Sequence, residues 1–377
     1  MQQRKEANLK PLRIIVSGGG TGGHIFPAIA IANAIKVLRP DTEFLFVGAE
    51  GKMEMEKVPA AGYKIEGLWI SGFQRKLTVS NLAFPFKVMS SLMKAKKILK
   101  SFKPDAVIGT GGFASGPMLR TAANAGIPTL IQEQNSYAGV TNKLLSKKVN
   151  RICVAYAGME KFFPKEKIIL TGNPVRQDIL SMEGKRDRGL EQFGLDGNKK
   201  IILVIGGSLG ARTINESIVN CLETFEQNNI QLIWQTGKGY YETAKQAVAK
   251  YDGKGMHAYD FIRKMDYAYA VADIVISRAG ASSVSELCLV KKPTILIPSP
   301  NVAEDHQTKN AMALVTHNAA IIIKDSEARE KLCGQAVALI KDEEECFKLS
   351  ERIAGLALPD SANVIANEVI HLVNSRQ

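Results

Sequence analysis

The sequence predicts an α/β protein made of two doubly wound domains, and three observations support this prediction. The chain has 377 residues, which is enough for two domains that each bury a core. Short apolar runs alternate with helical patterns from end to end, as is typical of βαβ units around parallel sheets. An apolar strand that enters a glycine turn and then a helix occurs twice, at 13–24 and at 200–211. This repetition indicates two domains of similar construction, joined near 172–176.

Six short apolar runs in each half have the length of buried strands, and helical patterns fall between them. In the first half the runs are 12–17, 43–47, 63–68, 106–109, 129–132 and 151–155. In the second half they are 201–205, 231–235, 256–259, 274–277, 294–297 and 320–323. Among the helices we expect 27–38, 215–225 and 282–289.

The segment after Pro359 has the pattern of one more helix, which we expect to pack back on the first domain. The predicted domains are therefore 1–175 with about 359–377, and 176–358. Ligands of doubly wound sheets bind beyond the carboxyl ends of the strands, so a cleft between the two domains is the expected active site.

The composition is that of a globular protein, with 45% apolar and 23% charged residues. No apolar run approaches the roughly 18 to 20 residues of a membrane-spanning helix. Residues 1–13 are polar and contain no apolar signal core, so we expect a cytoplasmic protein. The five cysteines are scattered without a C-x-x-C pair, which favours free thiols over disulfides or a metal site.

Positive charge is concentrated in the first half of the chain. Residues 1–175 carry 25 Lys and Arg against 11 Asp and Glu, whereas residues 176–377 carry 24 against 26. The segment between Gly67 and Pro104 has no acidic residue, and its basic residues alternate with bulky apolar ones. Such a segment can be an ordinary solvated helix face, but the combination favours contact with an anionic membrane surface. A nucleic-acid partner is not expected.

Three glycine-rich turns follow predicted strands, at 18–23, 109–112 and 206–210. Glycine lets the backbone approach a ligand closely, and the N–H groups that begin the following helix attract anions such as pyrophosphate. The pattern Gly18-x-Gly20-x-x-Gly23 alone would suggest a dinucleotide site, but only Asp41 and Glu43 could supply the acidic residue expected about 20 residues later. Three such turns favour two phosphorylated ligands over one dinucleotide.

The second half contains the pattern of a nucleotide-sugar site. The segment 277–286 combines a strand end, a turn of small residues and a helix start, where amides can hold a phosphate. Glu286 could accept hydrogen bonds from both hydroxyls of a ribose, and the polar residues of 305–310 could meet sugar hydroxyls. No D-x-D triplet occurs, so we expect no metal and assign stabilisation of the leaving diphosphate to helix N-termini and basic side chains.

Seven segments occur in an order and spacing that resemble one family. They are 18–24, 109–117, 133–135, 172–176, 206–208, 277–286 and 306–311. Together they resemble the MurG family of N-acetylglucosaminyltransferases, which convert lipid I to lipid II in bacterial peptidoglycan synthesis. The resemblance covers roughly residues 12–372.

The resemblance implies a GT-B fold and an inverting transfer that needs neither metal nor cofactor. The donor would be UDP-N-acetylglucosamine, and the acceptor would be the 4-hydroxyl of the muramoyl-pentapeptide of lipid I, at the cytoplasmic face of the inner membrane. The implied donor contacts are Thr21, Gly22, Gly23, Asn135, Arg176, Ser208, Ile262, Ala281, Ser282, Ser283, Val284, Ser285, Glu286 and Gln307. The implied contacts to the acceptor's pyrophosphate are Gly18, Gly19, Gly20, Gly109, Gly111 and Gly112.

The family pattern also distributes roles among these residues. Ile262 would present its backbone to the uracil, Glu286 would bind the ribose, and Gln307 and Asn135 would bind the sugar hydroxyls. The basic apolar segment after Gly67 would rest on the inner leaflet.

An inverting transfer needs a base for the proton of the attacking hydroxyl. His24 is the first candidate, because the start of a helix disfavours the imidazolium and keeps a neutral base. The alternative is that His24 caps the turn or binds phosphate. Glu133 is the second candidate, and its alternative is a carboxylate that stabilises a turn. Gln132 stands where many relatives carry His, so no base can be assigned there.

Other enzymes share parts of this pattern. A different GT-B transferase, such as a diacylglycerol glycosyltransferase, or a UDP-sugar epimerase would share the nucleotide site of the second half but not the motifs of the first. A non-catalytic lipid- or nucleotide-binding module is the alternative outside enzymes.

Overall fold

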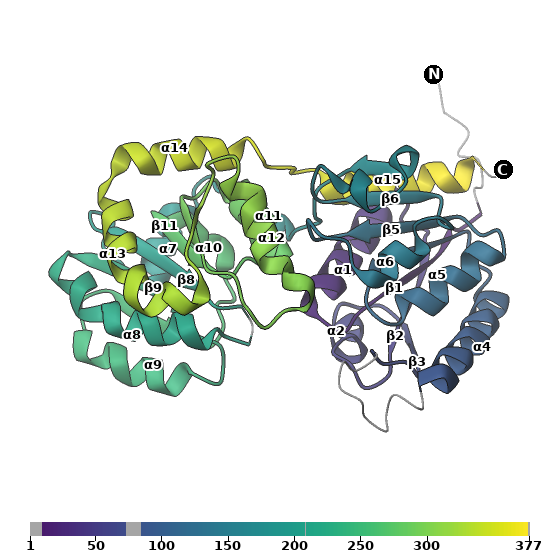
Figure 1. Cartoon of the computed structure of the whole chain (residues 1–377), viewed down its shortest axis with the longest axis horizontal. Coiled ribbons are helices and arrows are strands. Elements are labelled where there is room, and N and C mark those ends of the chain that lie inside the picture. The colour runs from purple at the N-terminus through teal and green to yellow at the C-terminus, as the bar shows by residue number, and fades with distance from the viewer. Residues whose placement is uncertain (1–9, 73–83, 208, 376–377) are drawn as a thin grey trace, which may run out of the picture. The chain divides into compact units, whose positions relative to one another are not determined.

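The computed structural model describes residues 10–72, 84–207 and 209–375. The chain divides into two compact units. Unit 1 comprises Met1–Val175 together with Asp360–Gln377, and unit 2 comprises Arg176–Pro359. Each unit is an α/β domain around one parallel sheet (Figure 1).

Unit 1 contains a seven-stranded sheet in the order β3-β2-β1-β4-β5-β6-β7, and every described pairing in it is parallel. Its strands are β1 (Arg13–Gly18), β2 (Glu43–Ala49), β3 (Ile65–Leu68), β4 (Ala106–Gly111), β5 (Thr129–Glu133), β6 (Arg151–Val154) and β7 (Ile168–Leu170). Its α-helices are α1 (Gly22–Leu38), α2 (Glu54–Ala60), α4 (Phe84–Phe102), α5 (Ser115–Asn124), α6 (Val140–Leu145) and α15 (Ser361–Asn374).

Helices cover both faces of this sheet, because its strands are apolar on both sides. Ile14 and Val16 of β1 pack in a core with α1 and α15, whereas Ile15 between them packs in a second core with α4 and α5. Successive side chains of a strand point to opposite faces, so one strand supplies both cores. Helix α15, at the yellow end of the chain in Figure 1, packs against α1 through Ile365 and Val369.

Unit 2 contains a six-stranded parallel sheet in the order β10-β9-β8-β11-β12-β13. Its strands are β8 (Lys200–Ile205), β9 (Ile230–Gln235), β10 (Met256–Tyr259), β11 (Ile274–Ser277), β12 (Thr294–Leu296) and β13 (Ile321–Ile322). Its α-helices are α7 (Lys185–Phe193), α8 (Arg212–Gln227), α9 (Tyr241–Val248), α10 (Met265–Val271), α11 (Ala281–Val290), α12 (His306–Val315), α13 (Ala328–Lys341) and α14 (Glu343–Ala354).

The strand order reverses between β8 and β11, which is the switch point where such sheets bind ligands. A buried polar contact fixes the neighbouring loop. The indole N–H of Trp234 donates to Oδ1 of Asn215 at 3.0 Å, and Nδ2 of Asn215 donates to the carbonyl of Thr236 at 2.9 Å. The start of α8 is thereby tied to the end of β9.

The twelve predicted strands all occur, with ends that shift by one or two residues. Strand β7 was not predicted, and α1 begins at Gly22 rather than at Pro27. Within the part of the chain that the structure describes, no helix is both long enough and apolar enough to cross a membrane. Residues 1–9, on which most of the expectation about a signal segment rests, lie outside the described residues.

Candidate active site

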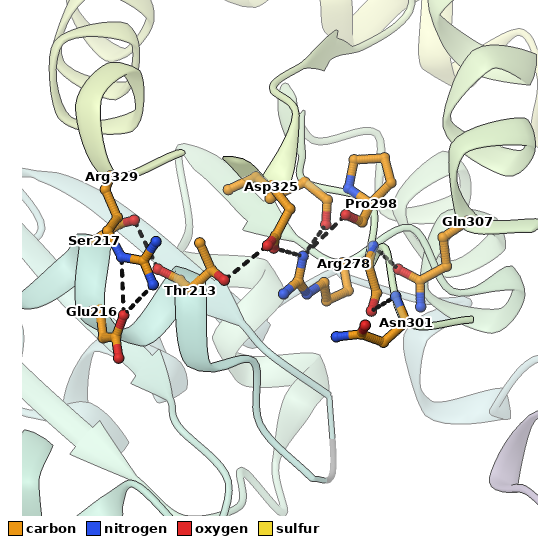
Figure 2. Close-up of polar contacts among 11 residues, drawn as sticks. Thr213, Glu216, Ser217, Arg278, Pro298, Asn301, Gln307, Asp325 and Arg329 are labelled. Carbon is orange, nitrogen blue, oxygen red and sulfur yellow. Dashed lines mark hydrogen bonds and ion pairs between the residues drawn. The ribbon is translucent and has the colours of Figure 1, made fainter. Parts of the chain in front are cut away.

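Unit 2 has a cavity of about 320 Å³ at the carboxyl ends of β8 and β11. Its lining comes from the glycine turn after β8, the starts of α8 and α11, the segment after β12, the start of α12 and the segment after β13. The lining residues are Gly206, Gly207, Gly210, Ala211, Arg212, Thr213, Arg278, Gly280, Ser283, Ser299, Asn301, Gln307 and Asp325. Figure 2 shows the polar contacts around this cavity.

Arg278 is the best-anchored cation of the cavity. Its Nη1 donates to the carbonyls of Ile297 and Pro298 at 3.0 and 3.1 Å and also contacts a carboxylate oxygen of Asp325 (Figure 2). Thr213 donates from Oγ1 to the other carboxylate oxygen at 2.9 Å. Both charged side chains are mostly buried, with exposed fractions of 13% and 17%. Arg278 is therefore held in one position at the cavity wall.

Two helices begin at this cavity. The first N–H groups of α8 and α11 have no acceptor within their own helices, and each helix carries partial positive charge at its start. The turn before α8 needs glycine, since a Cβ on Gly210 would lie 2.1 Å from the Thr236 carbonyl oxygen and its φ is +80°. These features make the cavity a site that favours a negatively charged ligand.

Gln307 lines the cavity from the first turn of α12. Its Oε1 accepts the backbone N–H of Ser299 at 2.8 Å, which orients the side-chain NH₂ as a donor (Figure 2). Ser283 and Gln307 are thus the predicted donor-site residues that the structure places in this cavity, in the company of Arg278 and Thr213.

Glu286 lies in the second turn of α11 and is almost fully buried. Its Oε1 accepts a hydrogen bond from Nε of Arg176 at 3.0 Å, and its Oε2 accepts one from the hydroxyl of Tyr269 at 3.0 Å. Burial raises the pKa of Glu286, against the opposing influence of Arg176. Burial also raises the pKa of Tyr269 well above its usual value, so the phenol remains a donor. Neither Glu286 nor Arg176 lines the cavity.

The other predicted donor contacts in unit 2 have different surroundings. Ile262 donates its backbone N–H to Oε1 of Gln235 at 3.0 Å. Val284 is buried in the core and donates its N–H to the carbonyl of Gly280, so neither its side chain nor its amide is open to a ligand. Its assignment as a donor contact stays a prediction. Ser208 lies outside the described residues. Ala281, Ser282 and Ser285 are partly exposed on α11.

The first glycine turn, in unit 1, is closed by a buried carboxylate. The N–H of Gly19 donates to the carbonyl of Gly111 at 3.3 Å, and the N–H of Gly20 donates to Oε2 of Glu54 at 2.8 Å. Both amides are therefore already bonded inside the protein, and the assignment of Gly19 and Gly20 to the acceptor's pyrophosphate stays a prediction. Thr21, Gly22 and Gly23 begin α1, where helix N–H groups have no intrahelical acceptor.

His24 lies in the first turn of α1 beside the second glycine segment. Its Nδ1 is 2.9 Å from the carbonyl oxygen of Gly19. A carbonyl only accepts, so this contact requires a proton on Nδ1 and makes Nε2 the basic nitrogen. A Cβ on Gly111 would lie 2.9 Å from Cδ2 and 3.0 Å from Nε2 of His24. The imidazole edge that carries Nε2 therefore lies against the backbone of Gly111.

The second glycine segment is part strand rather than a free turn. Gly109 and Gly111 belong to β4, and only Gly112 lies beyond it. Gly112 has a φ of +87°, and a Cβ there would lie 2.3 Å from the Gly19 carbonyl oxygen. Close packing against the first glycine turn explains Gly112, whereas Gly109 packs against Ser115 and Leu119 of α5. Ser115, which begins α5, is fully buried with an Oγ that has no partner among the described residues.

Glu133 ends β5 and organises the loop that follows. Its Oε1 accepts from the N–H of Asn135 at 3.1 Å, and its Oε2 accepts from the N–H of Gly139 and from Nδ2 of Asn142, both at 2.9 Å. Asn135 also donates from Nδ2 to Oε1 of Glu133 at 3.4 Å. The geometry favours the turn-stabilising interpretation of Glu133 over that of a catalytic base.

One side of helix α4 has exposed apolar residues in its N-terminal half and exposed lysines in its C-terminal half, which we call the α4 stripe. Phe86, Met89 and Met93 are 73%, 60% and 63% exposed, and their spacing of three and four residues places them on one side of the helix. Lys96, Lys97 and Lys100 continue the stripe and are exposed. Arg75 and Lys76, from the same basic segment, lie outside the described residues.

Sequence reasoning missed Glu54, Thr213, Arg278 and Asp325 as members of these sites. The motif 277–286 contains Arg278, so its place after a strand was a signal. Glu54 and Asp325 gave no such signal, because their hydrogen-bond partners lie 34 and 47 residues away in the sequence. Within the described residues, no cluster of three or more His, Cys, Asp or Glu side chains could hold a metal ion.

Comparisons with known proteins give a consistent family. The N-terminal domain model of glycosyltransferase family 28 matches residues 14–154, and the C-terminal domain model matches residues 201–365. A curated relative from Phocaeicola vulgatus, named UDP-N-acetylglucosamine–N-acetylmuramyl-(pentapeptide) pyrophosphoryl-undecaprenol N-acetylglucosamine transferase, is 59% identical and is covered at 97%, with 96% of this chain. A relative of the same name from Cytophaga hutchinsonii is 57% identical, with 97% of this chain and 98% of the relative covered.

Solved structures agree with these relatives. MurG from Acinetobacter baumannii has a TM-score of 0.77 at 28% identity, with 96% of this chain and all of that chain covered. A UDP-N-acetylglucosamine 2-epimerase has a TM-score of 0.63 at 15% identity, with 98% of each chain covered, and this likeness shows the fold alone. These comparisons confirm the predicted GT-B fold and the resemblance to the MurG family that the sequence motifs indicated. The chain is a glycosyltransferase of family 28 and belongs to the group that contains MurG and the transferases named above.

Proposed function

We propose that the protein transfers N-acetylglucosamine from UDP-N-acetylglucosamine to the 4-hydroxyl of the muramoyl-pentapeptide of lipid I, which gives lipid II. The observation that carries this proposal is the unit 2 cavity, where two helix starts and the fixed Arg278 offer positive charge to a diphosphate. Relatives that share more than half of the residues over nearly the whole chain carry this activity in their names.

Unit 2 would bind the donor. The diphosphate would contact the first amides of α11, including Ser282 and Ser283, and the guanidinium of Arg278. Glu286 would bind the ribose with the oxygens that also accept from Arg176 and Tyr269, since each carboxylate oxygen can accept two hydrogen bonds. Gln307 would donate from its NH₂ group to a sugar hydroxyl, and the Ile262 carbonyl would meet the uracil.

The departing UDP gains negative charge as the bond between the sugar and the phosphate breaks. Helix starts and an immobile arginine stabilise that charge without having to reorganise during the reaction. Arg278 suits this role because three acceptors fix one nitrogen of its guanidinium, while the remaining N–H groups stay available for the diphosphate.

Unit 1 would bind the acceptor. Its pyrophosphate would meet the glycine segments before α1 and α5, at the positions that the resemblance implies, Gly18, Gly19, Gly20, Gly109, Gly111 and Gly112, close to the first N–H groups of the two helices. The N–H groups of Gly19 and Gly20 are bonded internally, so the first N–H groups of the helices would supply hydrogen bonds to the anion. The basic excess of residues 1–175 supports an anionic ligand for this unit.

His24 would act as the base. The 4-hydroxyl oxygen forms a bond to the anomeric carbon of the donor sugar, the bond from that carbon to the UDP oxygen breaks, and Nε2 of His24 accepts the hydroxyl proton. Attack opposite the leaving UDP inverts the anomeric configuration. The contact from Nδ1 to the Gly19 carbonyl supports this role, because it keeps Nε2 as the nitrogen with the lone pair.

The protein would work at the cytoplasmic face of the membrane, where a lipid-linked acceptor is presented. The α4 stripe supports this location, since Phe86, Met89 and Met93 can enter the headgroup region while Lys96, Lys97 and Lys100 meet anionic lipid.

The test is transfer of labelled N-acetylglucosamine from its UDP donor to a short-chain lipid I analogue, with EDTA present. We expect a product of inverted anomeric configuration at full rate in EDTA. Binding of the donor without transfer to lipid I, or transfer to diacylglycerol instead, would contradict the proposed acceptor. Loss of activity in EDTA that returns with a divalent cation would contradict the proposed stabilisation of UDP by side chains and helix starts.

A further inference from the structure

We infer that Glu54 is a positioning residue for His24, and that it acts through the first glycine turn by holding the Gly19 carbonyl where it selects the Nδ1–H tautomer of the imidazole. This inference rests on the proposed role of His24 as the base. Glu54 itself touches no reacting atom in this account.

Glu54 is a carboxylate in a place where few carboxylates are found. It is fully buried, with an exposed fraction of 0%. A buried carboxylate is retained only where hydrogen bonds replace its water. Its Oε2 accepts from the N–H of Gly20 at 2.8 Å, and its Oε1 accepts from the N–H of Ala49 at 2.9 Å. The side chain therefore ties the end of β2 to the turn that follows β1.

The turn is built tightly around this carboxylate. A Cβ on Gly19 would lie 2.1 Å from Oε1 of Glu54, and a Cβ on Gly48 would lie 2.5 Å from its Cγ. Glycine on both sides therefore gives the carboxylate its space. The position of the Gly19–Gly20 peptide and the position of Glu54 are mutually fixed.

The Gly19–Gly20 peptide then orients His24. The N–H of this peptide donates to Glu54, and its carbonyl, which belongs to Gly19, accepts Nδ1–H of His24 at 2.9 Å. The Gly19–Gly20 peptide is thus hydrogen-bonded to the Glu54 carboxylate through its N–H and to the His24 imidazole through its carbonyl. Any rotation of the peptide plane that removes the first contact also removes the second. Hydrogen bonding of the N–H to an anion also makes the carbonyl a stronger acceptor.

Both contacts to Glu54 are donated by backbone N–H groups, so both oxygens of its side chain must accept a hydrogen bond. A carboxylate accepts at both oxygens, but the amide of a glutamine accepts at only one and places NH₂ against the other N–H. Glu54→Gln therefore keeps the volume of the side chain and breaks one of the two contacts. In the orientation of the amide that places NH₂ against the Gly20 N–H, the Gly19 carbonyl loses its fixed direction, whereas the other orientation retains it.

The decisive experiment is ¹⁵N NMR of the full chain labelled at histidine. The chain has five histidines, and His24→Asn identifies the His24 signals. In the unchanged protein we expect His24 to show the Nδ1–H tautomer. In Glu54→Gln we expect mixed tautomers and a nearly unchanged KM for UDP-N-acetylglucosamine. We expect kcat to fall roughly 10- to 100-fold, which is a part of the roughly 100- to 10,000-fold that a positioned acid or base contributes.

Asp105→Ala, which removes the side-chain acceptor, is the control. Asp105 also holds a backbone amide, since its Oδ2 accepts the N–H of Arg13 at 2.8 Å, but it does so at the other end of β1. This variant loses a similar contact in the same sheet, and we expect its His24 tautomer and its kcat to remain unchanged. If the Glu54 and Asp105 variants instead showed the same change in tautomer and in kcat, unit 1 would have been loosened generally, and the inference would be overturned.

Gly48→Ala provides a second variant in case Glu54→Gln folds poorly. The added methyl group would lie 2.5 Å from Cγ of Glu54 and 3.1 Å from Cδ1 of Ile65, so it displaces Glu54 from the strand side. We expect the same mixture of tautomers. An unchanged tautomer in the folded variants would overturn the role of Glu54. A changed tautomer with unchanged kcat would support the role of Glu54 in orienting the ring but would contradict His24 as the base.

Discussion

Nε of Arg176 donates a hydrogen bond of 3.0 Å to Oε1 of Glu286, which ties the first residue of unit 2 to helix α11. The hydroxyl of Tyr269 holds the other oxygen at the same distance. These two contacts leave one acceptor position on each carboxylate oxygen. In the proposed donor complex the carboxylate would therefore keep both protein partners while it accepts two ribose hydroxyls, and donor binding would complete its hydrogen bonding.

Glu286→Ala should raise the KM for UDP-N-acetylglucosamine. Hydrogen bonds to a charged group contribute about 1.5–3 kcal/mol, which corresponds to roughly 10- to 100-fold in affinity. Steady-state kinetics and calorimetric titration with UDP measure the effect. Tyr269→Phe keeps the carboxylate and should change KM much less. If Glu286→Ala retained both donor affinity and turnover, the ribose would bind elsewhere.

Donor affinity should fall as the pH is lowered into the range where Glu286 becomes protonated. Burial raises the pKa of Glu286, so this range lies above that of an ordinary glutamate. Below the raised pKa the carboxyl is neutral, loses acceptor capacity and leaves Arg176 without its counter-charge. Binding of UDP, measured by titration calorimetry across pH, should therefore show an acid limb. Glu286→Gln should bind weakly at every pH and lack that limb.

Arg278→Lys should lower kcat by roughly 100-fold, the size expected when one donor to a developing anion is lost. A lysine cannot serve the two carbonyls, Asp325 and a diphosphate at once, because it has three donors on a single atom. Transfer rates at saturating donor measure the loss. Arg329→Lys is the control, since Arg329 binds Glu216 on the exposed side of the same region and should leave kcat unchanged (Figure 2).

Reversal of charge at Lys96, Lys97 and Lys100 should weaken binding to vesicles that contain anionic lipid. Each lysine near such a surface contributes about 1 kcal/mol, so three reversals should reduce partitioning by 100-fold or more at low salt. Sedimentation with vesicles measures it. A matched triple reversal of the exposed Lys238, Lys245 and Lys250 of unit 2 should change the net charge equally without this loss. Equal effects of both triples would contradict a specific role for α4.

The sheets of both units followed from the sequence because their strands are buried on both faces and read as short apolar runs. Strand β7 escaped prediction because its three residues lie at the edge of the sheet beside a lysine-rich turn. The start of α1 was placed too late because proline favours the first turn of helices, whereas here the helix begins in the glycine turn and Pro27 lies inside it.

The site was predicted in part, and the residues that escaped share a physical reason. Gln307 and Ser283 stand in motifs that follow strands, so their place in the cavity could be inferred. The anchoring of Arg278 by Asp325 depends on a contact across 47 residues that no local pattern encodes. Glu54 likewise reads as the exposed start of a short helix, and only the fold turns it inward.

Helix α15 belongs to unit 1 although all of unit 2 precedes it in the chain. Ile365, Val369 and Val373 complete the core that α1 begins. During synthesis, unit 2 can leave the ribosome and fold while unit 1 still exposes the apolar surface of α1 that α15 later covers. Nascent unit 1 therefore keeps apolar surface exposed until α15 has been synthesised, and it matures only after the domain inserted within it.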